Sequence, residues 1–170
     1  MLEERKENGD SFYDLEKRLC AIRETFEETN ILLGTSSFVP KGKVPEKLNQ
    51  NEDFSLFCKN TFDIIPAIKK LNCLIRLASP IGIYPPVDSL FYIYFCRKSE
   101  IESEIKLNKT EFTEHTWLKA EEAIRKNFEE GFPLFFPTLV QLACLSQFKT
   151  GLELKNHVYE IEKNPLNFVT

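Results

Sequence analysis

Three glutamates and an arginine stand close together in the stretch IRETFEETN, residues 22 to 30. On a helix with about 100° per residue, Glu24, Glu27 and Glu28 fall on one side. Exposed carboxylates at this spacing repel one another by about 0.2 to 0.5 kcal/mol per pair, and a cation would relieve that repulsion. Arg23 can orient one carboxylate, whereas Mg²⁺ or Mn²⁺ takes several oxygen ligands. The spacing therefore permits two interpretations, a solvated helix face and a metal site.

The helix that must carry these residues is expected over residues 12 to 29, where neither proline nor glycine occurs. One face of it is apolar, with residues recurring at intervals of four, three and four: Leu15, Leu19, Ile22 and Phe26. These four fall within roughly 60° of one another, opposite the carboxylates. Asn30 follows where a helix often ends in the left-handed conformation, which asparagine tolerates well. The helix is thus predicted to separate a core face from a charged face.

The rest of the chain predicts an α+β fold. In chain order we expect a loop, a helix that Pro66 ends or kinks, two strands, a short alternating strand and two helices: residues 34 to 53, 54 to 70, 71 to 80, 87 to 96, 112 to 118, 119 to 131 and 137 to 148. A chain of 170 residues can build one core. We therefore predict one domain over residues 1 to 150, followed by a tail over residues 151 to 170 that is either ordered or frayed.

Composition argues against several classes of function. The chain has 22 Lys and Arg against 26 Asp and Glu, without a basic run, so nucleic acid is not an expected partner. The six glycines form no dinucleotide, phosphate-loop or serine-hydrolase motif. The longest apolar stretch, residues 131 to 148, contains two prolines and two glutamines, which favours a buried helix over a membrane span.

The cysteines and the chain start bear on the compartment. Five cysteines, widely spaced and without a C-x-x-C pair, predict buried thiols in a reducing compartment. The charged start MLEERKENGD lacks the apolar segment of a secretory signal. The cytoplasm is therefore the default expectation, with no membrane partner.

The stretch RETFEETNI resembles the Nudix box, G-x5-E-x7-R-E-U-x-E-E-x-G-U, in which U is a bulky apolar residue. Five residues occupy their slots in this pattern: Arg23, Glu24, Glu27, Glu28 and Ile31. Gly9 stands at the spacing of the first glycine, whereas Leu15 replaces the first glutamate, Thr25 occupies a U slot and Asn30 replaces the last glycine. The wider stretch RLCAIRETFEETNILL looks like the box of the Nudix subgroup of peroxisomal acyl-coenzyme A diphosphatases.

This resemblance implies a metal-dependent hydrolase that cleaves the diphosphate of a nucleoside diphosphate derivative, above all coenzyme A or acyl-coenzyme A. Glu27 and Glu28 would ligate Mg²⁺ or Mn²⁺. Glu24 would be a further ligand or the base that activates water, and Arg23 would hold a glutamate in place. Metal-bound water would attack a phosphorus atom while the ions neutralise the charge on the leaving phosphate. The products would be a phosphopantetheine species and adenosine 3′,5′-bisphosphate.

Weaker similarity extends over roughly residues 12 to 148. The stretch LASPIGIYPPVDSLFYIYF stands where the subgroup has W-x-T-P followed by R-F-D-T. Asp88 and Ser89 keep the polar pair, whereas Pro86 occupies the arginine slot. A further acid would come from a loop before the tryptophan-bearing strand. Glu111 is the candidate and Glu114 the competing choice, with Trp117 more typical of a core residue than of a stacking platform.

The family fold is an α/β/α sandwich that builds several strands and a P-G-G turn before the box. Here 22 residues precede Arg23, so we expect a Nudix domain that is incomplete at its N-terminus, with an exposed strand edge. Two alternatives stay open, a Nudix hydrolase for another nucleoside diphosphate substrate and a catalytically silent or truncated Nudix-like binding domain. The resemblance would permit a peroxisomal location, but targeting by a C-terminal signal is not predicted, because the chain ends in NFVT rather than a Ser-Lys-Leu type signal.

Overall fold

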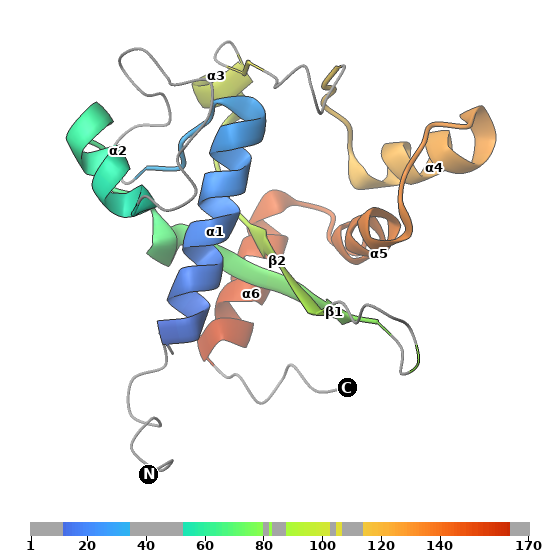
Figure 1. Ribbon diagram of the computed structural model, residues 1–170. Coiled ribbons are helices and arrows are strands. Elements are labelled where there is room, and N and C mark those ends of the chain that lie inside the picture. Colours follow the sequence, from blue (N-terminus) through green and yellow to red (C-terminus); the bar gives the residue numbers. More distant parts are fainter. Residues whose placement is uncertain are drawn as a thin grey trace. The chain divides into compact units, whose positions relative to one another are not determined.

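The computed structural model describes residues 12 to 34, 53 to 79, 82, 88 to 102, 105 to 106 and 114 to 163 (Figure 1). In chain order its elements are α1 (Phe12–Thr29), α2 (Phe54–Phe62), the 3-10 helix η1 (Ile68–Lys70), β1 (Asn72–Ala78), β2 (Asp88–Ile93), α3 (Lys98–Ile101), α4 (Ala120–Glu130), α5 (Phe136–Leu145) and α6 (Gly151–Lys163). Helices combine with antiparallel strands, so the α+β prediction is confirmed. The chain forms two compact units, residues 1 to 71 with 96 to 115, and residues 72 to 95 with 116 to 170.

The core of the first unit lies between α1 and α2, which stand side by side in Figure 1. On α1, Ile22 and Phe26 are buried, as the apolar stripe predicts, whereas Leu15 and Leu19 are half-buried. The ring of Phe26 lies 5.8 Å, centroid to centroid, from that of Phe62 on α2, in an edge-on arrangement that aromatic rings favour. Burial of the stripe turns the opposite face of α1 outward.

Left-handed Asp63, rather than Pro66, ends α2. The side chain of Asp53 accepts a hydrogen bond from the backbone N–H of Leu56 and caps the start of the helix. At the other end Asp63 has φ 55° and its N–H donates to the last carbonyls, which closes the helix. The prediction that Pro66 is the breaker was therefore wrong. Pro66 instead forms a bridge with Gly34, and the 3-10 helix η1 follows shortly after it.

The second unit contains an antiparallel sheet formed by β1 and β2, as the sequence predicts. The register pairs Asn72 with Ile93 and Ala78 with Asp88, with an irregularity between Cys73 and Ile75. Both α5 and α6 pack against β1. Across the described part of the chain, the sheet has these two strands.

The strand expected over residues 112 to 118 is wrong for its described part. Residues 114 to 118 form no regular element, and Glu114 and Thr116 are exposed. Polar residues alternate with more apolar ones in this segment, which is typical of a strand. A strand also requires a partner for its backbone hydrogen bonds. Residues 112 and 113 lie outside the described residues.

The tail is ordered over residues 151 to 163, where it forms α6. Leu154 and Val158 are buried one turn apart on this helix. The hydroxyl of Thr150 accepts from the N–H of Glu153, whose carboxylate accepts from the N–H of Lys149, in a pattern close to a capping box. The T-x-x-E sequence of residues 150 to 153 is a local signal that could have predicted this helix. Each helix in the described ranges is too short or too polar to cross a bilayer.

Gly131 ends α4 in the left-handed conformation, with φ 71°. We expect Gly131→Ala to lower the free energy of unfolding by about 1 to 2 kcal/mol, because a Cβ disfavours this conformation. The added atom would meet nothing within 4 Å, so the cost is one of backbone conformation. Gly151→Ala is the matched control, since it has open space and no positive φ. Urea denaturation of both variants checks this, and equal losses would contradict the explanation.

The prediction that the cysteine thiols are buried holds for one cysteine and is wrong for the others. All five lie in described residues and none forms a disulfide, but Cys20 and Cys96 are exposed and only Cys58 is buried. Burial raises the pKa of Cys58 to about 12. Since the unfolded thiol ionises near a pKa of about 8.5, the contribution of Cys58 to stability is present below that value and lost as the pH rises from it towards about 12.

Because Cys20 is exposed and Cys58 is buried, the two thiols are expected to react with a labelling reagent at different rates. Near pH 8, Ellman's reagent is expected to modify Cys20 in the folded protein and Cys58 only after unfolding in guanidinium, because the reactive species is the accessible thiolate. Peptide mass spectrometry after timed labelling identifies the sites. Equal labelling rates for the two thiols in folded protein would contradict the burial of Cys58.

Candidate functional site

The outward face of α1 carries the four charged residues of the box-like stretch. The Nε of Arg23 donates to Oε1 of Glu27 at 2.6 Å, across one helical turn. This hydrogen bond, helped by the negative charges of Glu27 and Glu24, raises the pKa of Arg23 above its usual value. The two side chains are 21% and 34% exposed, so the pair lies at the surface with limited solvent access. This hydrogen bond restrains the side chain of Glu27, and the role that the resemblance implies for Arg23 stays a prediction.

The other two glutamates lie on the same side. Glu24 is exposed and Glu28 is half-buried, while Ile22 and Phe26 on the opposite side are buried. The predicted separation of a core face from a charged face is confirmed. Because α1 is anchored by its apolar face, its carboxylates are presented from a rigid element rather than from a loop.

The end of α1 is built as the sequence indicates. Asn30 is left-handed, with φ 61°, and its N–H donates to the carbonyl of Phe26 at 2.8 Å. The chain then enters the core, where Ile31, at the last apolar position of the box pattern, is only 3% exposed. The carbonyl of Thr29 accepts from the N–H of Lys106 at 3.0 Å, which ties the end of α1 to a distant part of its unit.

The donor chemistry of this face suits a divalent ion, but the geometry is not that of a preassembled site. Carboxylate oxygens are the ligands that Mg²⁺ and Mn²⁺ prefer. Glu27 uses one oxygen to accept from Arg23, and a carboxylate has a second oxygen that can ligate. Within the part of the chain that the structure describes, no three His, Cys, Asp or Glu side chains form a group that could hold a metal ion. An ion bound here would have to draw the glutamates together or take further ligands.

The remaining residues singled out in the sequence do not belong to α1. Glu111, Gly9 and Pro86 lie outside the described residues, so the structure does not place them. Glu114 is exposed in an irregular segment. Trp117 is 43% exposed, so the core role expected for it is wrong.

Asp88 of the R-F-D-T-like stretch has an arginine partner that sequence reasoning missed. Arg76 on β1 donates from Nε to Oδ1 of Asp88 at 2.7 Å and from Nη2 to Oδ2 at 2.6 Å. This two-point pair depends on the register of β1 against β2, which pairs Arg76 with Leu90 and so places it diagonally opposite Asp88. The signal that could have found it is opposite charge near facing ends of two predicted strands joined by a turn.

No model of a known protein family matches this chain, and no curated protein or solved structure matches it either. The functional assignment therefore depends on the residues of α1 and the geometry they adopt.

Proposed function

We propose that the protein is a metal-dependent hydrolase of the Nudix type, which cleaves the diphosphate of a nucleoside diphosphate derivative. The substrate class that we favour is coenzyme A or acyl-coenzyme A, because residues 18 to 33 resemble the box of the acyl-coenzyme A diphosphatase subgroup. The observation that carries the proposal is the charged face of α1, where Arg23 orients Glu27 beside Glu24 and Glu28. A Nudix-type α/β/α sandwich is part of the proposal, and the α+β composition supports it at a coarse level.

Each charged residue has a distinct task in this proposal. Glu27 and Glu28 would hold Mg²⁺ or Mn²⁺, which when bound supplies positive charge against the negative charge that develops on the phosphates. Glu24, exposed on the same face, would accept a proton from the attacking water, or ligate a metal. Arg23 would keep Glu27 in the orientation that its hydrogen bond defines. Glu111 remains the candidate for a further acid.

A substrate panel tests the proposal directly. The full chain would be incubated with coenzyme A, an acyl-coenzyme A and other nucleoside diphosphate derivatives, with Mg²⁺ or Mn²⁺, in ¹⁸O-labelled water. We expect adenosine 3′,5′-bisphosphate and a phosphopantetheine species from the first two substrates, with one labelled oxygen on a product phosphate. Hydrolysis of a different diphosphate alone would support a Nudix enzyme with another substrate. Absence of product from every substrate in a folded sample would contradict a hydrolase.

The substitution Arg23→Gln tests whether Arg23 orients Glu27 for metal binding or only stabilises α1. We expect it to lower metal affinity or the hydrolytic rate by about 10- to 100-fold, the usual loss when a residue that orients a ligand is removed. Stability should fall by only about 0.5 kcal/mol, because the pair is a surface contact across one helical turn. Arg125→Gln is a matched control, since Arg125 forms the same kind of pair with Glu129 on α4. Equal effects of the two substitutions on hydrolysis would contradict a positioning role for Arg23.

The second candidate function is a catalytically silent, Nudix-like binding domain. It is favoured by the lack of a three-donor metal group among the residues that the structure describes. This alternative predicts that coenzyme A raises the melting temperature of the protein without being hydrolysed, since a ligand that binds the folded state stabilises it. Thermal melting with and without Mn²⁺, alongside the product assay, distinguishes the two functions.

A further inference from the structure

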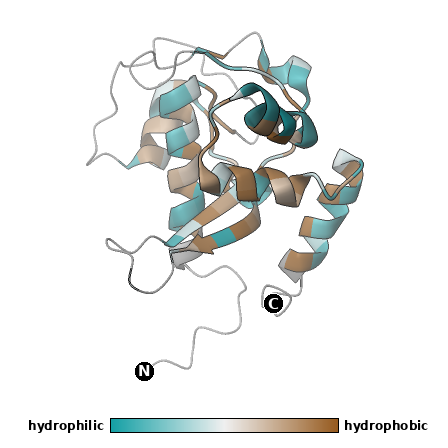
Figure 2. Cartoon of the chain, turned by 90° about the vertical axis from the view of Figure 1, so that its right-hand side faces the viewer, coloured by the Kyte–Doolittle hydropathy of each residue, from teal (hydrophilic) through white to brown (hydrophobic). Residues whose placement is uncertain are grey.

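Helix α5 is apolar in sequence but incompletely covered in the fold. Its sequence is FPTLVQLACL, and none of its ten residues is buried. Figure 2 shows α5 mostly in brown, whereas α4, which packs against it, is mostly teal. A helix that is apolar around most of its circumference is usually enclosed by other elements. Its contacts with α4 and β1 leave apolar area that these neighbours do not cover.

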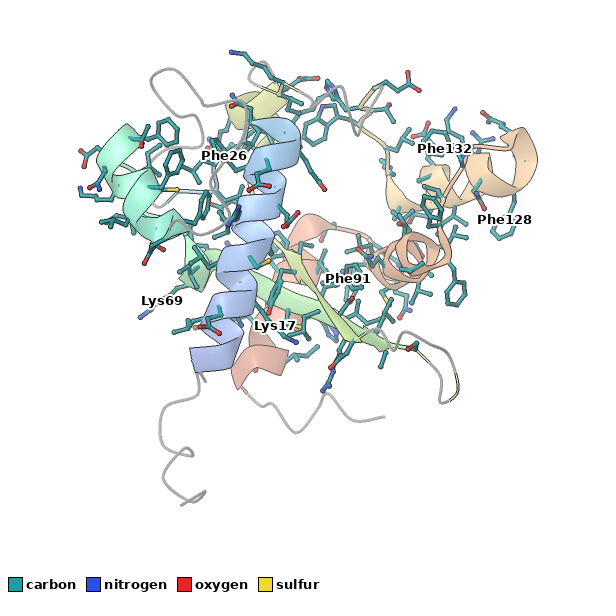
Figure 3. All side chains as sticks on the ribbon, in the orientation of Figure 1. Lys17, Phe26, Lys69, Phe91, Phe128 and Phe132 are labelled. Atoms are coloured by element: carbon teal, nitrogen blue, oxygen red, sulfur yellow. The ribbon has the colours of Figure 1, made fainter. Side chains whose placement is uncertain are left out.

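The end of α4, the connection after it and the start of α5 carry the most exposed large apolar side chains of the described residues. Phe128 is 77% exposed, Phe135 is 84% exposed and Phe136 is 76% exposed. The turn between them is held by the side chain of Asn127, which donates to the carbonyl of Phe132 at 2.6 Å. In Figure 3, Phe128 lies at the outer edge of this part of the molecule. We call Phe128, Phe135 and Phe136 the phenylalanine surface.

The area of the phenylalanine surface suits the centre of a protein interface. A phenylalanine side chain that becomes buried removes about 150 to 250 Å² from water, so these three offer about 350 to 600 Å². A standard interface covers about 800 Å² on each partner, with an apolar centre and a polar rim. The uncovered area of α5 lies next in sequence and extends the apolar centre. Two phenylalanine surfaces would bury about 700 to 1,200 Å² together, so an interface of standard size, about 1,600 Å², requires the adjoining side of α5 as well.

The charges beside the phenylalanine surface favour a second copy as the partner. In the last turns of α4, Arg125 pairs with Glu129 and Glu130, each at 2.9 Å, and Lys126 pairs with Glu130 at 3.0 Å. Hydrogen bonds from Lys126 and Arg125 lower the pKa of Glu130, so it stays ionised at neutral pH. These two positive and two negative charges balance within one chain. Two copies can therefore approach these last turns without like-charge repulsion, whereas an anionic membrane would find no excess of basic residues on α4.

We propose that two copies of this chain associate through the phenylalanine surface and the adjoining side of α5. A two-fold dimer is the commonest protein assembly and buries the same patch on both copies, so one apolar surface serves as both partners. Edge-on packing of phenylalanine rings from the two copies would contribute beyond the area buried. This association does not depend on the function proposed for α1.

Sedimentation velocity of the full chain tests the dimer. The weight-average mass should rise from 19.8 kDa towards twice that value as the concentration approaches about 100 µM. Phe135→Ser combined with Phe136→Ser should weaken association by roughly tenfold or more, as expected for central interface residues. Leu152→Ser is the matched control, because Leu152 is 68% exposed on α6, outside the phenylalanine surface. Circular dichroism confirms that each variant folds.

Several outcomes would overturn this proposal. These are a mass that stays at 19.8 kDa over this range, a double variant that associates as wild type does, and a Leu152→Ser variant that dissociates equally. A photo-crosslinking benzoylphenylalanine at position 135 keeps the test decisive if the double variant does not fold. It should yield a covalent dimer, and absence of one overturns the proposal. Binding of a monomer to phosphatidylcholine vesicles, with no dimer in solution, would assign the surface to a membrane instead.

Discussion

Substituting Glu27 and Glu28 together by glutamine is expected to weaken Mn²⁺ binding by about 100-fold or more. The physical reason is the loss of two charged oxygen ligands, since even residues that only orient metal ligands contribute about 10- to 100-fold to affinity. Glutamine keeps the size and helix propensity of glutamate, so α1 should remain folded. Removing the pair between Arg23 and Glu27 costs at most about 0.5 kcal/mol. Isothermal titration calorimetry with Mn²⁺ measures the change, and the rate of diphosphate cleavage should fall by about 100- to 1000-fold with it.

A matched substitution on the same helix makes this result specific. Glu16 is exposed on α1 but lies outside the box-like stretch, so Glu16→Gln removes one charge from the helix without touching the proposed site. It should leave both Mn²⁺ affinity and hydrolysis unchanged. If the double variant is folded and binds Mn²⁺ as tightly as wild type, the metal site is wrong. The charged face of α1 is then a solvated surface, and the binding-domain alternative is favoured.

Phe26→Ala is expected to lower the free energy of unfolding of the first unit by about 3 to 5 kcal/mol. Phe26 is 2% exposed, and its ring lies 6.1 Å from that of Phe54 and 5.8 Å from that of Phe62. Truncation leaves a cavity between α1 and α2 and removes both ring contacts. Because whole domains are stable by only about 5 to 15 kcal/mol, much of the fold should be lost. Guanidinium denaturation followed by far-ultraviolet circular dichroism measures the loss.

The control for Phe26→Ala is a large apolar residue at the surface of the same unit. Leu56 on α2 is 57% exposed, so Leu56→Ala removes little buried area and should change stability by about 0.5 kcal/mol or less. A similar loss for both variants would contradict the view that the Phe26 contacts hold α1 to α2. Phe26→Ala, unlike Leu56→Ala, is also expected to lose diphosphate cleavage, because the carboxylates of α1 need an anchored helix.

The fold serves the proposed chemistry by fixing the direction in which α1 presents its charged face. Ile22 and Phe26 anchor one side of α1, and Arg23 and Glu27 are paired on the other side. Burial of the first side restricts how α1 can rotate, so the second side keeps a constant outward direction. The direction of the glutamates therefore depends on the aromatic contacts behind them, although no aromatic ring takes part in the proposed chemistry.

Local sequence determined α1, its two faces and its end. Helical periodicity repeats every 3.6 residues, so the positions of Ile22 and Phe26 relative to Glu24 and Glu27 follow from their spacing alone. Asn30 was predicted for the same reason, since its left-handed conformation depends on the residue type more than on distant contacts. The two strands were also predicted, because runs of β-branched and aromatic residues between turn signals mark strands locally.

Features that require two distant segments were decided by tertiary structure. Residues 114 to 118 have a strand-like pattern but form no strand, because pairing depends on another segment supplying hydrogen bonds. The pairing of Arg76 with Asp88 depends on strand register. Exposure of Trp117 and Cys20 depends on which elements pack over them, and composition carries no such information.

In the candidate site, too, some features follow from local sequence and others depend on tertiary structure. The sequence by itself determined which residues share the outward face of α1, because one helix carries all of them and its geometry is fixed by backbone hydrogen bonds. Tertiary structure alone decided that this face is held outward by Phe26 and its ring contacts, and that Thr29 at its end is tied to Lys106. The physical reason is that helical geometry needs only neighbours in the sequence, whereas burial and long-range hydrogen bonds need segments that the folded chain brings together.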